Sequence, residues 1–156
     1  MRYFTNIIDY HKDAKLSQLL AQRRAPLSEE GMRIALTDLT LYLCEDVEFI
    51  GSAFLKDTTK KDLNIADIDR ADMMEGTDGE RYFPVFTDTE LFHSFKPQLK
   101  EGESLLLLTK QDLLDFLNGN ERIAAVVANP MEDDLLLYRV QLSNMIALAK
   151  QKDSRR

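Results

Sequence analysis

The stretch SLLLLTKQDLLDFLNGNERIAAVVA, residues 104–128, decides the fold that the sequence predicts. Its first part, Leu105–Leu108, is an all-apolar run, as expected for a strand that is covered on both faces. Thr109–Asp112 follows with the capping pattern of a helix start, and Gly119 is a suitable residue to end that helix. Ile123–Ala128 is a second apolar run. Strand, capped helix and strand in succession predict a βαβ unit with parallel strands and a right-handed crossover.

A β-hairpin is predicted immediately upstream, near residues 65–86. Leu63–Met73 carries apolar and acidic residues in imperfect alternation, which indicates a half-exposed strand. Glu75–Gly79 contains an Asp-Gly pair, a good hairpin signal. The returning strand is Tyr82–Phe86, in which Pro84 removes one backbone donor and therefore indicates an edge position or a bulge.

Two helices are predicted near the N-terminus. Apolar periodicity indicates a short amphipathic helix over residues 13–24, which Pro26 ends. Ser28 is the expected N-cap of a second helix. The core stripe of this second helix consists of Met32, Ala35, Leu36 and Leu39. Leu41–Cys44 is short and strand-like, whereas Val47–Leu55 is compatible with either a strand or a helix.

The chain is predicted to turn back after the second apolar run. Asn129 and Pro130 end that strand, and Met131–Asp134 forms a turn. We expect a further strand over residues 135–142. A short closing helix then contains Met145, Ile146 and Leu148.

Together these elements predict a mixed α/β (α+β) fold, with N-terminal helices and a mixed sheet in one three-layer-like domain. The length of 156 residues fits a single domain, which we place at residues 1–149. Residues 150–156 form a basic tail without an apolar anchor, and we expect this tail to fray. Eight Phe, five Tyr and a hydrophobic content of 44% argue against disorder.

Charge is uneven along the chain, which carries 20 Lys+Arg against 27 Asp+Glu, a net charge of −7 and a pI near 4.9. Residues 57–80 carry a net charge of −5, whereas residues 1–24 and residues 150–156 each carry +3. The acidic balance disfavours nonspecific binding to nucleic acid, so we expect no such partner. We interpret the acidic middle as a solvated surface, and the alternative is a region that binds a cation or a basic partner.

The sequence carries none of the common catalytic or metal-binding motifs. His11 and His93 have no Cys or second His at ligand spacing, and Cys44 has no His near it in sequence. The glycines form neither a phosphate-binding loop nor a nucleophile elbow. One dense carboxylate cluster fails the calcium-loop pattern, and it consists of Asp67, Asp69, Asp72, Asp78 and Glu80. We expect no cofactor, no metal and no enzymatic activity.

This carboxylate cluster has two interpretations. Charges along an exposed strand keep a sheet edge soluble, which is the simpler explanation. The alternative is that Asp67 and Asp69, which would share one strand face, hold a hard cation weakly.

The sequence also favours a cytoplasmic protein without a membrane partner. A single cysteine gives no sign of an oxidising compartment. Asp9 interrupts the apolar stretch that a signal peptide would need. The longest apolar run is the six residues Ile123–Ala128, whereas a membrane-spanning helix needs about 20.

Two strand-to-loop junctions resemble those of a known family. Arg81–Asp88 reads RYFPVFTD, and Ala125–Pro130 reads AVVANP. A Pro-Val-Phe-Thr-Asp junction followed later by a strand that ends in Asn-Pro is similar to the SseB N-terminal domain family, the bacterial serine-sensitivity family. The likeness is strongest over residues 81–130. It implies a bacterial, cytosolic, mixed α/β protein without established catalytic residues, in a family whose members often carry a second, C-terminal domain.

The resemblance carries over to four residues. Thr87 and Asp88 match the family's Thr-Asp, and Asn129 and Pro130 match its Asn-Pro. Each pair also has a structural explanation, because Thr87–Glu90 is a capping box for a short helix and Asn-Pro closes a strand in a tight turn. The functional interpretation is that both junctions end strands of one sheet, lie close together and line an interaction groove.

These observations favour a non-catalytic protein-interaction or regulatory module of the SseB type, which docks an unknown protein partner or a second copy of itself. The alternative is a small-molecule-sensing domain with a pocket at the strand ends near Thr87 and Asn129. A third hypothesis is a hydrolase or transferase that uses carboxylates of the acidic middle. It is weaker, because carboxylate catalysis needs a pair held in a cleft.

Overall fold

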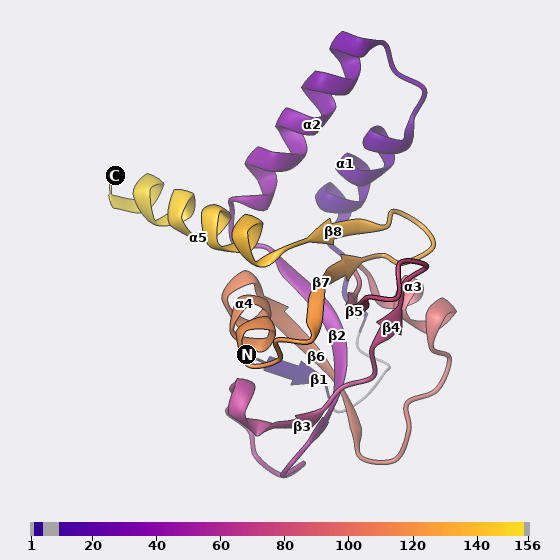
Figure 1. Cartoon of the computed structure of the whole chain (residues 1–156), viewed down its shortest axis with the longest axis vertical. Helices are drawn as coiled ribbons and strands as arrows, with labels where there is room; N and C mark the ends of the chain where they lie inside the picture. The colour runs from indigo at the N-terminus through magenta and orange to yellow at the C-terminus, as the bar shows by residue number, and fades with distance from the viewer. Residues whose placement is uncertain (1, 5–9, 155–156) are drawn as a thin grey trace.

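The computed structural model describes residues 2–4 and 10–154, which form five α-helices and two four-stranded sheets (Figure 1). The predicted mixed α/β (α+β) class is confirmed. None of the helices in these residues is long and apolar enough to cross a membrane.

The first sheet is antiparallel and has the strand order β1-β6-β2-β3. Its strands are β1 (Arg2–Phe4), β2 (Glu48–Leu55), β3 (Ile68–Arg70) and β6 (Glu103–Thr109). The segment that the sequence left open between strand and helix is therefore β2. Strands β2 and β6 pair along their length, from Glu48 opposite Thr109 to Phe54 opposite Glu103.

The second sheet has the order β4-β5-β7-β8. Its strands are β4 (Met74–Glu75), β5 (Arg81–Val85), β7 (Ile123–Ala128) and β8 (Leu135–Leu137). Strands β5 and β7 are parallel, and the two outer strands are antiparallel to their neighbours. The two sheets meet where Ile50 and Phe86 exchange backbone hydrogen bonds of 2.8 Å.

The predicted βαβ unit near 104–128 and the single mixed sheet are wrong, although both strands exist and helix α4 (Lys110–Asn118) lies between them in sequence. Strand β6 belongs to the first sheet, and the parallel partner of β7 is β5. An apolar run shows that both faces of a strand are covered, but not which strand lies beside it. Both faces of β6 are indeed covered, because Leu106 lies in the main core and Leu107 in a second cluster.

The predicted hairpin near 65–86 exists in a shorter form. Strands β4 and β5 pair across a turn in which Gly76 N–H donates to the Glu80 carbonyl at 2.8 Å. Pro84 does not mark an edge strand as predicted, because β5 lies between β4 and β7; it lies beyond the end of the two-residue β4, on the side of β5 where no strand needs its backbone donor.

The segment 63–73 is not the long strand that its alternation predicts. Ile65–Asp67 is a 3₁₀ turn, η1, and the short β3 that follows pairs with β2 instead of β5. A local capping box favours the turn, because the Asn64 side chain accepts from the Ala66 N–H and the Asp67 carboxylate accepts from the Asn64 N–H.

Helices α1 (Ala14–Arg24) and α2 (Glu29–Leu43) form a hairpin that extends away from the sheets (Figure 1). The predicted Ser28 cap is confirmed, since its hydroxyl accepts from the Gly31 N–H at 3.1 Å. The strand predicted at Leu41–Cys44 is wrong, because α2 continues to Leu43 with Leu39 and Leu43 buried on one face. Leu36 was expected in the core but is 44% exposed, since α2 buries only the stripe that faces α1 and the body.

The C-terminal part contains more helix than its pattern predicts. The strand expected over 135–142 ends at Leu137, and α5 (Arg139–Ser154) replaces the short closing helix. A hydrogen bond of 2.9 Å from the Tyr138 N–H to Gln141 Oε1 closes the first turn of this helix. Helix α5 also covers residues 150–154 of the predicted frayed tail, and residues 155–156 lie outside the described part.

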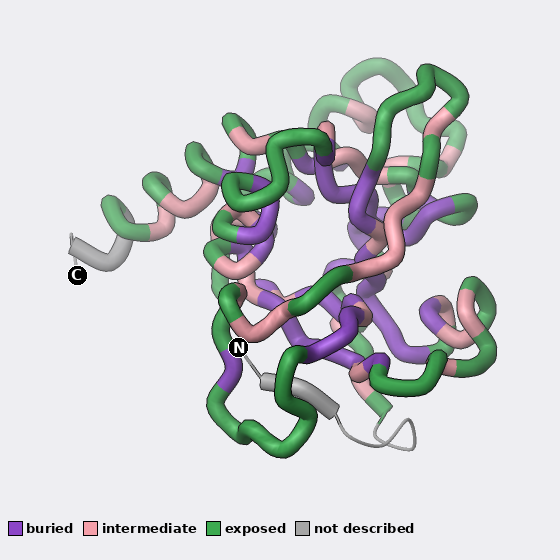
Figure 2. Tube along the Cα trace, turned by 60° about the horizontal axis from the view of Figure 1, so that its bottom comes forward, coloured by how far each residue is buried: buried purple, intermediate pink, exposed green. Residues whose placement is uncertain are grey.

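Burial concentrates in the sheets and in the helix faces turned toward them, whereas the outer half of α5 is largely exposed or half-exposed (Figure 2). Fully buried aromatic residues fill the space between the elements, and they are Phe49, Phe83, Phe86 and Phe92. The sheets are therefore a packed frame that holds the loops at the strand ends.

Candidate functional site

The carboxyl ends of the parallel strands β5 and β7 lie side by side. Val85 is opposite Ala128, and the Asn129 N–H donates to the Val85 carbonyl at 2.8 Å. Thr87 and Asp88 after β5, and Asn129 and Pro130 after β7, consequently meet at one edge of the second sheet. The structure thus brings all four candidate residues together.

The Asn129 amide is hydrogen-bonded within the protein. Its Oδ1 accepts from the Thr87 N–H at 2.9 Å, and its Nδ2 donates to Thr87 Oγ1 at 2.9 Å and to Asp133 Oδ2 at 2.7 Å. Thr87, Asn129 and Asp133 are all buried. Thr87 and Asn129 therefore hold the two junctions together and are not free to bind a ligand.

Two arginines at the end of α1 extend this network. Arg24 Nε lies 2.6 Å from Asp133 Oδ1, and Arg23 Nη1 donates to the Asp133 carbonyl at 2.9 Å. Within residues 10–154, Asp133 Oδ1 receives no aligned hydrogen bond, so the adjacent guanidinium compensates it by charge. No local sequence pattern indicates this contact, because α1 and Asp133 are far apart in the chain.

Asp88 has the local role that its residue type suggests. It is the N-cap of α3 (Thr89–Phe95), and its Oδ1 accepts from the Leu91 N–H at 2.7 Å. The predicted capping box at Thr87–Glu90 is therefore wrong: the N-cap is Asp88, its N3 residue is Leu91, which has no side-chain acceptor, and Thr87 is engaged by Asn129. The next hydroxyl, Thr89 Oγ1, accepts from the His11 N–H at 2.8 Å.

The loop after β7 carries unusual backbone geometry. Asn129, Met131 and Asp134 have positive φ values of 52°, 68° and 48°. Asn and Asp tolerate this region, whereas a long unbranched side chain such as that of Met is uncommon there. The loop is closed by hydrogen bonds from the Glu132, Asp133 and Asp134 N–H groups to the Asn129 carbonyl, at 3.1, 2.9 and 3.1 Å. The Met131 side chain is left 84% exposed.

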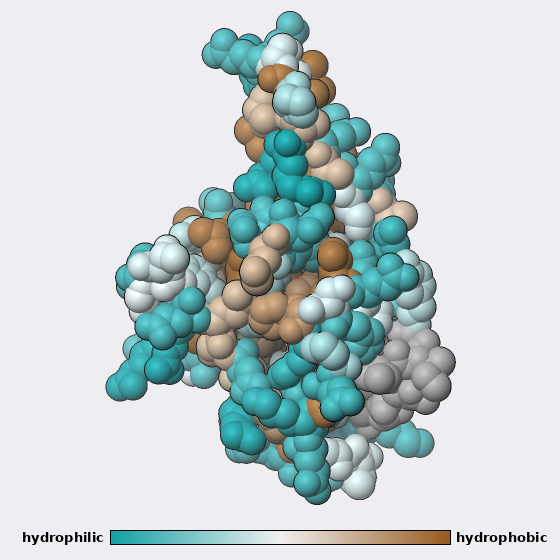
Figure 3. All heavy atoms as spheres, turned by 90° about the vertical axis from the view of Figure 1, so that its right-hand side faces the viewer, coloured by the Kyte–Doolittle hydropathy of each residue, from teal (hydrophilic) through white to brown (hydrophobic). Residues whose placement is uncertain are grey.

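Two shallow apolar depressions flank this loop. One, of about 170 Å³, is lined by Phe86, Leu91, Ser94, Phe95, Asn129, Pro130, Met131 and Glu132. The other, of about 200 Å³, lies on the outer face of the second sheet and is lined by Met74, Glu75, Gly76, Tyr82, Val127, Pro130, Asp134 and Leu136. Pro130 borders both. Figure 3 views this side of the molecule and shows apolar side chains gathered in the middle of the face. We call the loop 129–134 with these two depressions the strand-end surface.

The acidic cluster is dispersed in the structure. Asp67 belongs to η1 and not to a strand shared with Asp69, so the predicted common face is wrong. The Asp67 carboxylate pairs with Lys60 at 2.8 Å, and this ion pair and the Asn64 N–H lower its pKa. Asp78 accepts from the Tyr82 hydroxyl, which lowers the pKa of Asp78. In the part of the chain that the structure describes, no group of three or more His, Cys, Asp or Glu residues could hold a metal ion.

An ion pair between the buried Glu103 and the half-buried Lys96 lies near this region. Glu103 accepts from Lys96 Nζ at 2.5 Å, from the Lys100 N–H at 2.9 Å and from the Ser52 hydroxyl at 2.8 Å. Burial disfavours the charged form of Glu103, but these three donors outweigh it and lower its pKa. Lys96 also pairs with Asp72 at 3.0 Å. The group joins β6, β2 and the loop after α3, and its partners are satisfied, so its role is structural.

Lys110 is a further buried charge that sequence patterns missed. Its Nζ donates to the Leu43 and Glu45 carbonyls at 2.5 and 2.7 Å, which satisfies the end of α2. Burial lowers the pKa of Lys110. The two remaining candidates have packing roles: His93 lies edge-on to Phe92 with ring centroids 5.4 Å apart, and Cys44 is the half-buried C-cap of α2.

Comparison of the chain with protein-family models, with curated proteins and with solved structures gave no match.

Proposed function

We propose that this chain is a non-catalytic interaction module that docks a protein partner on the strand-end surface. The observation that carries the proposal is Met131, which an otherwise well-bonded loop holds at positive φ with its side chain 84% exposed. Unfavourable backbone geometry persists where the surrounding structure enforces it, and it concentrates at functional sites. An exposed Met offers a flexible, polarisable contact of the kind used on binding surfaces.

The size of the two depressions supports a protein rather than a small molecule at this surface. At about 170 and 200 Å³ they fall below the roughly 300–1,000 Å³ of small-molecule sites. They suit single side chains of a partner, the anchor residues that carry most of the binding energy in protein interfaces. The small-molecule alternative near Thr87 and Asn129 is disfavoured here, because both side chains are engaged with each other.

Charge around the surface narrows the class of partner. Glu75 and Asp134 line the second depression, Glu132 of the first depression pairs with Arg24 at 3.2 Å, and the net charge of the chain is −7. We therefore propose a partner that presents apolar anchor side chains flanked by Lys or Arg, since complementary rim charges speed association and select partners. The resemblance to the SseB N-terminal domain family is in keeping with this proposal, because that family has no established catalytic residues.

The experiment compares immobilised native chain with the variant Met131→Asp. Aspartate tolerates positive φ, so the change removes the apolar contact without straining the loop. We expect a protein retained by the native chain to be lost by Met131→Asp.

Leu41→Asp is the matched control, because Leu41 is 63% exposed on α2, away from the strand ends. Sedimentation of the same proteins tests whether the partner is a second copy. Equal retention by all three chains would contradict the proposal, and so would a native chain that retains nothing and sediments as a monomer.

A further inference from the structure

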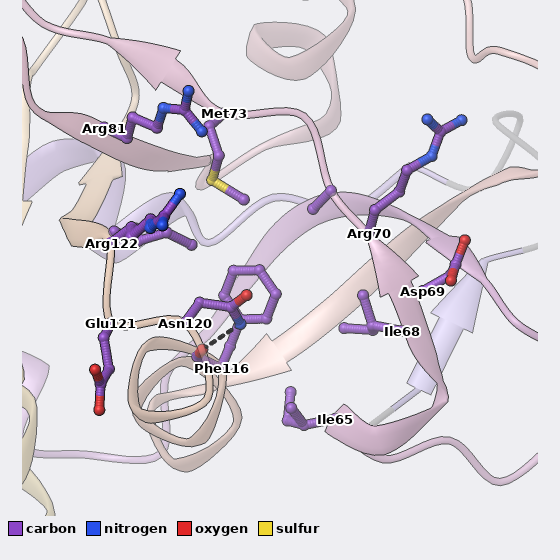
Figure 4. Close-up of a pocket in the computed structure, with 12 residues that line it drawn as sticks. Ile65, Ile68, Asp69, Arg70, Met73, Arg81, Phe116, Asn120, Glu121 and Arg122 are labelled. Carbon is purple, nitrogen blue, oxygen red and sulfur yellow. Dashed lines mark hydrogen bonds between the residues drawn. The ribbon is translucent and has the colours of Figure 1, made fainter.

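A larger cavity lies at the opposite, amino-terminal ends of β5 and β7. It has a volume of about 380 Å³, within the range of small-molecule sites. Its apolar lining comes from η1, β3 and its following loop, α4 and the start of β7, and consists of Ile65, Ile68, Ala71, Met73, Phe116 and Ile123 (Figure 4). Phe116 and Ile123 are each 5% exposed, so the floor of the cavity is part of the core.

Two arginines border one side of this cavity. Arg81 opens β5, and Arg122 directly precedes β7. Arg81 is in register with Ile123, and Arg122 is the residue before Ile123, so both arginines lie at the amino-terminal ends of the parallel strands and line the cavity. Figure 4 shows both beside Met73, whereas the Glu121 carboxylate points away from the cavity.

Neither arginine is neutralised by the protein around it. Among residues 10–154, the side chains of Arg81 and Arg122 make no ion pair and no hydrogen bond, unlike Arg23, Arg24 and Arg139. Two unpaired guanidinium groups on one side of a cavity attract an anion to that side.

The arginine on the opposite side of the cavity, Arg70, already contacts an aromatic ring of the protein. Arg70 stacks on the Phe54 ring with its guanidinium carbon 4.1 Å from the ring centroid. Asp69 lies beside Arg70 on that side (Figure 4). The unpaired positive charge is therefore concentrated at Arg81 and Arg122.

The loop that carries Arg122 is held in place from beneath. Arg139, at the start of α5, donates to the Leu117, Asn120 and Ile123 carbonyls. Asn120 Nδ2 donates to the Phe116 carbonyl at 2.8 Å, the dashed line in Figure 4. These bonds fix the loop before any ligand arrives, which reduces the ordering cost of binding.

We propose that this cavity binds a small organic anion, with its carboxylate or phosphate oxygens at Arg81 and Arg122 and its apolar part over Phe116 and Ile68. Guanidinium groups match both oxyanions through paired N–H donors. The apolar floor selects an acid that carries a hydrophobic group over a bare inorganic anion. This site is separate from the strand-end surface and does not depend on the proposed docking function.

The test is a titration of isotope-labelled full chain followed by NMR, with phenylacetate, phenyl phosphate, phenylacetamide and inorganic phosphate as probes. We expect phenylacetate or phenyl phosphate to shift the amide signals of residues 68–73 and 120–123 at millimolar concentration. Their relative affinities distinguish a carboxylate from a phosphate ligand. Phenylacetamide, which has no charge, and inorganic phosphate, which has no apolar part, should bind at least about tenfold more weakly.

The double variant Arg81→Gln and Arg122→Gln should bind the acid at least about tenfold more weakly than the native chain does. Both residues are exposed, so the fold should tolerate the change. Arg33→Gln, an exposed change on α2, is the matched control and should bind as the native chain does. No shifts with either acid, equal binding of phenylacetamide or inorganic phosphate, or unchanged binding by the double variant would each overturn the proposal. Met131→Asp should leave these shifts unaltered, so failure here is distinguishable from failure of the docking proposal.

Discussion

Replacement of Asn129 by Ala tests how the two strand ends are joined. The change removes the hydrogen bonds to the Thr87 N–H, to Thr87 Oγ1 and to the Asp133 carboxylate. An unsatisfied buried donor costs about 1–3 kcal/mol, and bonds to charged groups contribute about 1.5–3 kcal/mol. The three bonds share one side chain and do not add fully, so we expect a loss of about 3–5 kcal/mol in the free energy of unfolding.

The variant Asn129→Gly separates the hydrogen bonds from the backbone. It loses the same bonds but relieves the φ of 52°, which disfavours Ala by about 1–2 kcal/mol. Glycine is ordinarily about 0.5–1 kcal/mol less stable than alanine within regular structure, because its unfolded chain is freer. We therefore expect the order to be reversed here, with Asn129→Gly more stable than Asn129→Ala by about 0.5–1 kcal/mol.

Urea denaturation of the three proteins, followed by circular dichroism, measures both differences. The slope of the free energy against urea should be the same for all three, since the surface exposed on unfolding hardly changes. A loss below about 1 kcal/mol for Asn129→Ala would refute the buried network. If Asn129→Ala is as stable as Asn129→Gly or more stable, the positive φ at this position is refuted, whatever the size of the total loss in the free energy of unfolding.

Three further predictions concern single side chains. Met131→Gly should raise the melting temperature by about 1–4 °C in calorimetry, because relief of the φ of 68° outweighs the freer unfolded chain of glycine, while it weakens partner retention; a lower melting temperature would contradict this. The lowered pKa of Glu103 means that its charged form stabilises the fold at neutral pH, and that this stabilisation is lost as the pH falls through that pKa. In urea denaturation at a series of pH values, the free energy of unfolding of Glu103→Gln should therefore fall less toward acidic pH than that of the native chain. The hydrogen bond to Asp78 raises the pKa of Tyr82 to about 12, and Asp78→Asn should return it toward 10 in an ultraviolet titration, where no change would argue against the bond.

Features of the fold that depend on residues close together in the sequence were predictable from it. Thr109 and Asp112 form the expected capping box of α4, and the all-apolar run of β6 is covered on both faces. The partner of β6 was not predictable, since burial of both faces is compatible with any neighbour. Leu41 shows the same limit at shorter range, because four residues are too few to distinguish strand alternation from the end of a helix.

The candidate site was predictable only in its backbone positions. Thr87 and Asn129 follow two strands, and their proximity depended on these strands being adjacent and parallel, which they are. Two residues that shape the strand-end surface, Asp133 and Met131, were not predicted from the sequence. Asp133 is buried through Arg24, from the other end of the chain, and Met131 has no sequence signal for positive φ. The pair Arg81 and Arg122 emerges only from strand register, which no local pattern encodes.

The order of the strands has a consequence for how the chain folds. In sequence, β6 lies between β5 and β7, yet in space it belongs to the other sheet. The two sheets are thus interleaved, and no cut in the chain separates one from the other. Pairing of β5 with β7 closes a long loop that contains β6, and β6 itself pairs in the other sheet. Closing such a long loop slows folding. We accordingly expect a single cooperative transition in which the strand-end surface and the arginine-lined cavity form and are lost together.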